Sequence, residues 1–266
     1  MNNLVQIVQE IFNNTELDIV IGYEISSKGT RPLFCRSKED VLRLVLNEKC
    51  INNIAVYLTR KDIIGKGKIL ITATIPVLRS IIQLHLENQI DAKQLIVVTK
   101  NKNDEVIIFS NIEEIIEWLE DYPLNVSEEN SKLVENLRNM PREERWEFWK
   151  HEMSRCIKCY ACRAACPLCY CSKCIVDTNC PQWIQPWSTT LSNIEWQINR
   201  VMHLTGRCTN CGACAKACPE RIPIHLITIS MMENIKENFG DDMKVVNNCN
   251  NLLANFNVSD KENFIL

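Results

Sequence analysis

The sequence predicts an α+β protein, with an N-terminal α/β domain followed by a helical, cysteine-rich domain. Strand and helix patterns alternate through roughly the first 120 residues. Twelve of the 15 cysteines then lie between Cys156 and Cys218. The segments 155–167 and 207–219 also share one cysteine spacing. A hydrophobic share of 46% is ordinary for a globular protein and leaves enough apolar residues for a core in each domain.

The α/β domain is expected at residues 1–125. Leu4–Phe12 has the apolar spacing of a helix, Leu17–Ile25 reads as a strand, and Arg31–Phe34 is expected to pair with that strand. Further strands are predicted at Lys68–Ile75, Gln94–Thr99 and Glu105–Phe109, and further helices at Ser37–Leu46, Val77–Glu87 and Ile112–Leu119. The strand–helix–strand order over 68–99 predicts a parallel βαβ unit.

A helical connection is expected at 126–154, because Pro141–Met153 begins with proline and acidic residues, which suit a helix N-terminus. The cysteine-rich domain follows at 155–240, with helices predicted at Leu191–Leu204 and Ile224–Asn238. The tail 241–266 is rich in Asn and Asp, and we expect it to be poorly ordered.

Composition and the absence of targeting patterns limit the possible partners and the cellular location of the protein. The net charge of −3 gives no support to a nucleic-acid partner. The N-terminus lacks the basic region of a signal peptide, and no apolar run is long enough for a membrane span. The expected location is therefore cytoplasmic. Thiols stay reduced there, so metal binding explains the cysteines better than disulfides do.

The repeated spacing carries the chemistry. RCIKCYACRAACP (155–167) and RCTNCGACAKACP (207–219) both read C-x2-C-x2-C-x3-C-P. This run holds [4Fe–4S] clusters in two-cluster ferredoxins, where the fourth cysteine ligates the other cluster. The second domain is thus predicted to be a bacterial-ferredoxin-like domain with two [4Fe–4S] clusters. The predicted ligands are Cys156, Cys159, Cys162 and Cys218 for one cluster, and Cys208, Cys211, Cys214 and Cys166 for the other.

A pair of zinc sites is the alternative, since C-x2-C pairs also bind zinc. Zinc leaves unexplained the third cysteine and the fourth cysteine before proline, each of which occurs twice. In the cluster interpretation cysteine fills every ligand position, which favours electron conduction over catalysis at the irons. Arg155 and Arg207 precede the two runs and either stabilise the negative clusters or are solvated residues before a turn.

A second set of cysteines is a candidate third metal site. It consists of Cys169, Cys171, Cys174 and Cys180, with Cys50 as a substitute for Cys180. The spacing C-x-C-x2-C-x5-C is not that of a ferredoxin. Its occupant is either a third Fe–S cluster or a zinc ion with four thiolate ligands. The alternative is a loop that holds free buried thiols.

With these motifs in hand, the chain resembles the iron–sulfur subunits related to the β subunits of formate dehydrogenases and deazaflavin-reducing hydrogenases. Within that group it is most similar to those that accompany heterodisulfide-reductase-like, electron-bifurcating complexes of anaerobes. The resemblance is carried by RCIKCYACRAACPLCYCSKC (155–174), PQWIQPW (181–187), RVMHLTGRCTNCGACAKACP (200–219) and PLFCRSKEDVLRLVLNEKCINNIAVYL (32–58). It implies a non-catalytic electron-transfer subunit whose partners are flavin- or Fe–S-containing subunits of a redox complex.

One departure bears on catalysis. Members of the group tend to have a Gly-Cys-Asp-Ser-Arg-like turn after the central strand, whereas this chain has TATIPVLRS (72–80), without the Cys and Asp. This favours an electron relay over the alternative of a flavin-binding catalytic β subunit that reduces a deazaflavin or nicotinamide. A third alternative, an iron–sulfur sensor or zinc module that binds nucleic acid, is disfavoured because no basic patch is evident.

Overall fold

The computed structural model describes residues 3–65, 67–124 and 126–239. The chain divides into two compact units, an N-terminal unit, Met1–Pro123, and a C-terminal unit, Leu124–Leu266. The predicted tail 241–266 lies outside the described residues. A five-stranded sheet combined with many helices confirms the predicted α+β class.

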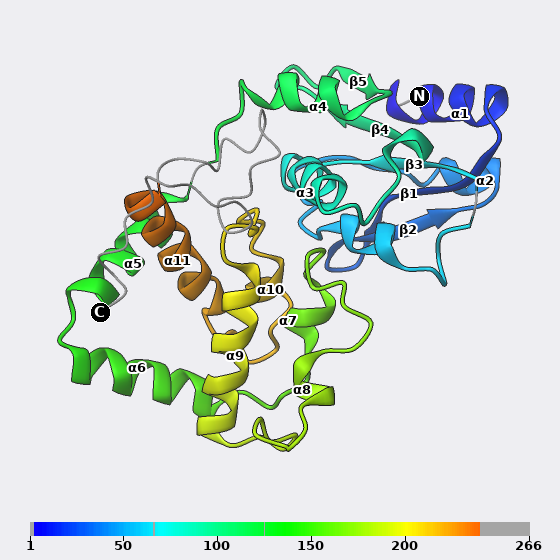
Figure 1. Ribbon diagram of the computed structural model, residues 1–266. Helices are drawn as coiled ribbons and strands as arrows, with labels where there is room; N and C mark the ends of the chain where they lie inside the picture. The colour runs from blue at the N-terminus through cyan, green and yellow to red at the C-terminus, as the bar shows by residue number, and fades with distance from the viewer. Residues whose placement is uncertain (1–2, 66, 125, 240–266) are drawn as a thin grey trace. The chain divides into compact units, whose positions relative to one another are not determined.

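The N-terminal unit is built on one mixed sheet with the strand order β2-β1-β3-β4-β5 (Figure 1). Its strands are β1 (Leu17–Ser26), β2 (Gly29–Cys35), β3 (Lys68–Thr72), β4 (Leu95–Lys100) and β5 (Val106–Phe109). Its helices are α1 (Asn3–Asn14), α2 (Lys38–Val41), α3 (Ile75–Leu86) and α4 (Ile112–Leu119), with 3₁₀ turns η1 (Ile54–Thr59) and η2 (Ala92–Gln94). β3 pairs in parallel with β1 and β4, so the βαβ prediction is confirmed. β2 and β5 add antiparallel edges, and the pairing of β2 with β1 is as predicted.

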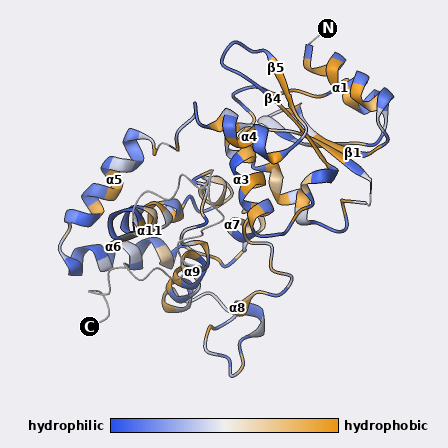
Figure 2. Ribbon diagram, turned by 45° about the horizontal axis from the view of Figure 1, so that its top comes forward, coloured by the Kyte–Doolittle hydropathy of each residue, from blue (hydrophilic) through white to orange (hydrophobic). Residues whose placement is uncertain are grey.

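The centre of this sheet is buried on both faces. Six consecutive residues of β1, Ile19 to Glu24, are buried, which requires cover on both sides because side chains alternate along a strand. Figure 2 shows β1, β4 and β5 as predominantly hydrophobic strands. At Gly22 a Cβ atom would lie 2.4 Å from Leu44 Cδ2 and 2.8 Å from Thr72 Oγ1, so only glycine fits there.

Two predicted boundaries were wrong, one for a tertiary reason and one because the next helix begins earlier than expected. The helix expected to run from Ser37 to Leu46 ends at Val41. The chain then turns so that Val45 N donates to Tyr23 O at 2.8 Å, a bridge to β1 that a longer helix would prevent. β3 ends at Thr72 instead of Ile75, because Ile75 opens α3 with Thr74 as its N-cap.

The C-terminal unit is helical. Its helices are α5 (Glu128–Asn139), α6 (Arg142–Ser154), α7 (Ala161–Ala164), α8 (Ile175–Thr178), α9 (Thr190–Leu204), α10 (Ala213–Lys216) and α11 (Ile224–Phe239). α9 packs against α6 and α11, and the short helices α7 and α10 contact each other (Figure 1). α5 had no counterpart among the individually predicted helices. Its Val134 and Leu137 pack on Leu226 and Ile229 of α11.

None of the helices in the described ranges combines the length and the apolar character that crossing a lipid bilayer requires.

Candidate metal centre

The two cysteine runs fold into loops of the same conformation. The residues that follow Ile157 and Cys159 in the first loop, Lys158 and Tyr160, have φ values of 52° and 58°. Their counterparts in the second loop, Asn210 and Gly212, have φ values of 50° and 68°. A single helical turn then follows in each loop, α7 and α10. The repeat in the sequence is therefore also a repeat in backbone geometry.

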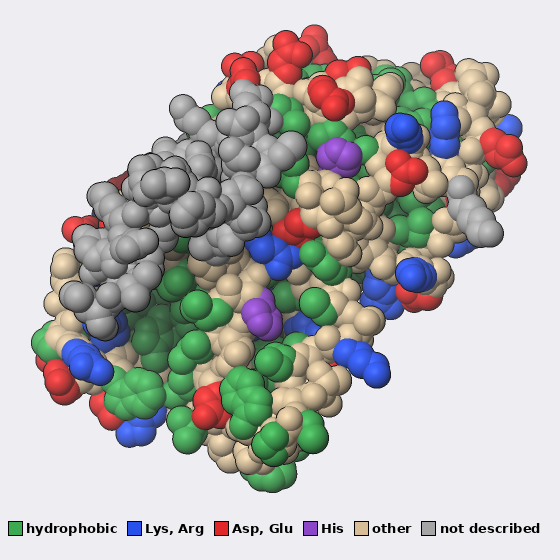
Figure 3. Space-filling model, in the orientation of Figure 1, with side chains coloured by type: hydrophobic (Ala, Val, Ile, Leu, Met, Phe, Trp, Pro, Cys, Tyr) green, Lys and Arg blue, Asp and Glu red, His purple; other side chains and the backbone are tan. Residues whose placement is uncertain are grey.

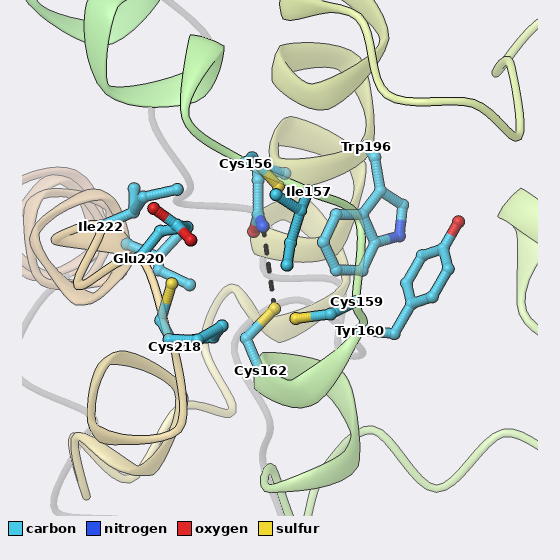
Figure 4. A pocket seen from close by; sticks show the side chains of 12 residues that line it. Cys156, Ile157, Cys159, Tyr160, Cys162, Trp196, Cys218, Glu220 and Ile222 are labelled. Atoms are coloured by element: carbon cyan, nitrogen blue, oxygen red, sulfur yellow. Dashed lines mark hydrogen bonds between the residues drawn. The ribbon is translucent and has the colours of Figure 1, made fainter.

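The first loop and the end of the second repeat share one pocket. Cys156, Cys159 and Cys162 line it together with Cys218, which comes from the far end of the other run (Figure 4). The structure thus brings together the four residues that the spacing assigned to one cluster.

The remaining wall of this pocket is largely apolar. The Tyr160 ring packs edge-on against Trp196 with the ring centroids 5.0 Å apart. Ile222 and Ile224 line the pocket and are 2% and 1% exposed. Such a wall limits hydration on this side of the pocket, although Cys159 is exposed, and hydration is one of the factors that set a cluster's potential.

The second predicted set of ligands is also gathered in one place. Burial, and to a smaller extent the nearby thiols of Cys214, Cys166 and Cys211, raise the pKa of the Cys208 thiol to about 12. The metal-free thiol is therefore protonated at neutral pH. A bound metal favours the thiolate and releases that proton. Buried thiols whose charge is this costly suit a site in which iron balances the charge.

Arg200 is a buried cation among these thiols. Arg200 is 5% exposed, and its Nη2 donates to the carbonyl oxygen of Cys162 at 3.3 Å. Its Nε and Nη1 have no hydrogen-bond partner in the described part of the chain. Burial lowers the pKa of Arg200, and the surrounding thiols of Cys214, Cys169, Cys166 and Cys162 raise it above its usual value. The unpaired N–H groups of Arg200, beside cysteines of both predicted ligand sets, are suited to donate to the sulfur atoms of a negatively charged cluster.

Arg200 belongs to a polar stripe on α9 that sequence reasoning missed. Asn193 Nδ2 donates to the carbonyl oxygens of Met153 at 3.0 Å and Cys156 at 2.8 Å. Gln197 Nε2 approaches Cys162 Sγ at 3.7 Å, the contact drawn in Figure 4. The spacing 193, 197, 200 places these side chains on one helix face. The sequence did contain a signal for this stripe, because polar residues recur at helical spacing in line with the apolar Leu204.

The two arginines singled out in the sequence make other contacts. Arg155 pairs with Glu152 and donates to the Glu220 carbonyl at 3.0 Å. Arg207 donates to the His203 carbonyl at 2.8 Å and to the Tyr170 hydroxyl at 3.0 Å. These contacts tie the start of each loop to neighbouring segments.

The structure does not gather the candidate third set. Cys169 hydrogen-bonds with Cys166, Cys174 packs against the core around Trp196, and Cys171 and Cys180 are exposed. The substitute ligand Cys50 is buried in the N-terminal unit, where its thiol receives a hydrogen bond from Asn47 N at 3.4 Å. A third metal site stays a prediction.

The spacing of the cysteines in the sequence fits a cluster better than a single zinc ion. A zinc ion needs sulfur atoms about 2.3 Å from one centre, hence within about 4 Å of one another. Among the residues that the structure describes, no three Cys, His, Asp or Glu side chains are arranged to hold one ion. A cubane offers four irons at separate corners, so its ligands stand farther apart. Because each run repeats a full set of four cysteines, the sequence spacing favours Fe–S clusters over zinc.

Large apolar side chains are exposed on the same unit. Figure 3 shows hydrophobic side chains gathered over the part of the C-terminal unit at the bottom of the view. In this unit Ile157, Trp183, Trp187 and Leu191 are between 49% and 61% exposed. Ile157 also lines the pocket, so exposed apolar surface reaches the first cysteine loop.

Comparisons with known proteins agree with this chemistry. The model of the 4Fe–4S binding domain family matches residues 203–223, which contain Cys208, Cys211, Cys214 and Cys218. A segment of 113 residues is 35% identical to the F420-dependent formate dehydrogenase subunit beta of Methanocaldococcus jannaschii. That segment is 41% of this chain and 29% of the relative. The chain therefore carries a 4Fe–4S binding domain.

Proposed function

We propose that this chain relays electrons through two [4Fe–4S] clusters as a subunit of a larger oxidoreductase complex. One cage consists of Cys156, Cys159, Cys162 and Cys218, and the other of Cys208, Cys211, Cys214 and Cys166. Each such cluster, when bound, accepts and donates one electron at a time. Because cysteine supplies all four ligands, no iron is left open to a substrate.

The observation that carries this proposal is the position of Cys218. It lines a pocket with three cysteines that precede it by more than fifty residues. In a two-cluster ferredoxin the fourth cysteine of one run completes the other cage, which requires this juxtaposition. The matched left-handed positions of the two loops support a second, equivalent cage.

Several features support a place in a complex. The aligned relative is named as a subunit, so it belongs to an assembly. Exposed apolar side chains next to the first cysteine loop are typical of a protein–protein interface. We propose partners of the flavin- or Fe–S-containing type, as in heterodisulfide-reductase-like complexes of anaerobes, and a cytoplasmic location. A partner bound to the exposed apolar side chains near Ile157 would exchange electrons with the cluster held by Cys156, Cys159, Cys162 and Cys218.

Analysis of anaerobically purified protein tests the relay. We expect about eight irons and eight sulfides per chain, no zinc, and EPR signals of reduced [4Fe–4S] clusters after dithionite. The reduced clusters should be reoxidised by a one-electron acceptor. A colourless preparation, or one that holds only zinc, would contradict the proposal. About twelve irons would add a cluster at the third set of cysteines.

One finding favours the alternative of a flavin-binding catalytic subunit, namely that the aligned relative is named as F420-dependent. Under that alternative the N-terminal unit would hold a flavin. Flavin that stays with the purified full-length chain through gel filtration would support it. Intact clusters in protein without flavin would support the relay alone.

A further inference from the structure

We propose that Arg200 is a positioning residue shared by both cages, whose fixed positive charge stabilises the reduced clusters and raises their reduction potentials. The inference rests on the proposed function, because it assigns Arg200 a role toward the two clusters.

The surroundings of Arg200 lack the usual partner of a buried arginine. The residue is 5% exposed, and a buried guanidinium is costly unless an anion or good hydrogen-bond acceptors compensate it. No carboxylate among the described residues forms an ion pair with it. Its Nη2 donates to the Cys162 carbonyl at 3.3 Å, its guanidinium also hydrogen-bonds with the thiols of Cys169 and Cys214, and Nε and Nη1 have no partner among the described residues. The compensating negative charge must come from the sulfur atoms around it.

Those sulfur atoms belong to both cages. Cys162 is a predicted ligand of the first cluster, whereas Cys166 and Cys214 are predicted ligands of the second. The thiol of Cys169, which is hydrogen-bonded to that of Cys166, also lies beside the guanidinium. Arg200 therefore lies where the two ligand sets approach each other, and its unpaired N–H groups can donate to sulfur on either side.

The expected effect follows from charge. Arginine keeps its proton at any physiological pH, so its charge is permanent. A cluster becomes more negative when it gains an electron, and hydrogen bonds to sulfur and nearby positive charge stabilise that state. In a desolvated site this stabilisation is screened little by salt. Removing the charge should therefore make both clusters harder to reduce.

The role of Arg200 differs from that of its neighbours on α9. Asn193 holds the backbone carbonyls of Met153 and Cys156, and Gln197 reaches a single sulfur, that of Cys162. In these bonds Asn193 contacts the end of α6 and the first loop, Gln197 contacts the first loop, and both side chains are neutral. A loss of packing would affect all three positions, whereas a shift of both potentials should be specific to Arg200.

The test compares Arg200→Met, which removes the charge, with Arg200→Lys, which keeps it, in the full-length protein. The readouts are iron content and an EPR-monitored redox titration. We expect both potentials to fall in Arg200→Met and to return most of the way in Arg200→Lys. Arg155→Met is the matched control, because Arg155 is likewise an arginine near a predicted ligand, Cys156, but is exposed and paired with Glu152. Its potentials should equal those of the native protein.

Each outcome is decisive. Unchanged potentials in an iron-replete Arg200→Met protein would overturn the proposal. If that variant assembles no clusters, full iron in Arg200→Lys supports a requirement for the charge, and loss of iron there too shows a purely steric role and overturns it. Native protein that binds no iron at all would instead refute the proposed function.

Discussion

At the scale of single residues, the first cysteine loop is fixed by a buried lysine. Lys158 is 6% exposed, and its Nζ donates to the Trp187 carbonyl at 3.1 Å, to Ser192 Oγ at 2.9 Å and to the Gln185 carbonyl. These bonds connect the loop between Cys156 and Cys159 with the segment that leads into α9. All three protons of the ammonium group are thereby used.

Replacing Lys158 with Met should release that segment. Each acceptor left unpaired in a buried site costs about 1–3 kcal/mol. We expect Lys158→Met to lower the temperature at which the visible absorbance of the clusters is lost. Lys173→Met serves as the control, because Lys173 is exposed, and it should leave that temperature unchanged. Equal temperatures for the two variants would show that the Lys158 bonds do not hold the loop.

At the scale of elements, local signals were predictable from sequence and long-range ones were not. The helix over Ile112–Leu119 was predicted, and it begins at Asn111, whose side chain accepts a hydrogen bond from Glu114 N, a contact that involves only neighbours in the chain. The end of α2 depends on a bridge between Val45 and Tyr23, which no local pattern reveals. Arg200 was missed for a similar reason, because arginine on a helix is normally solvated and only its anionic surroundings explain its burial.

The cap of α4 can be tested directly. Loss of an N-cap side chain costs about 1 kcal/mol, so Asn111→Ala should speed amide hydrogen exchange in the first turn of α4 by about fivefold. Asn111→Asp keeps an acceptor at the same place and should restore native exchange. Exchange in Asn111→Ala at the native rate would mean that tertiary packing alone holds this helix end.

At the scale of the whole molecule, the fold class and the grouping of cysteines could be read from the sequence because both depend on repeated spacing. Alternating strand and helix signals predicted the sheet, and the doubled run predicted that Cys218 meets the loop of Cys156. The set from Cys169 to Cys180 follows no ferredoxin spacing, so its arrangement could not be predicted. Its first member, Cys169, hydrogen-bonds with Cys166, a predicted ligand of the second cluster.

The exchange of the fourth cysteine between the two cages is the central claim, and iron content in a pair of variants tests it most directly. Serine at positions 156, 159 and 162 should leave only the cluster of the second loop, with about four irons per chain. Adding Cys166→Ser to this background should remove that iron, whereas adding Cys218→Ser should leave it in place. The opposite pattern, with iron lost through Cys218→Ser and kept through Cys166→Ser, would contradict the account.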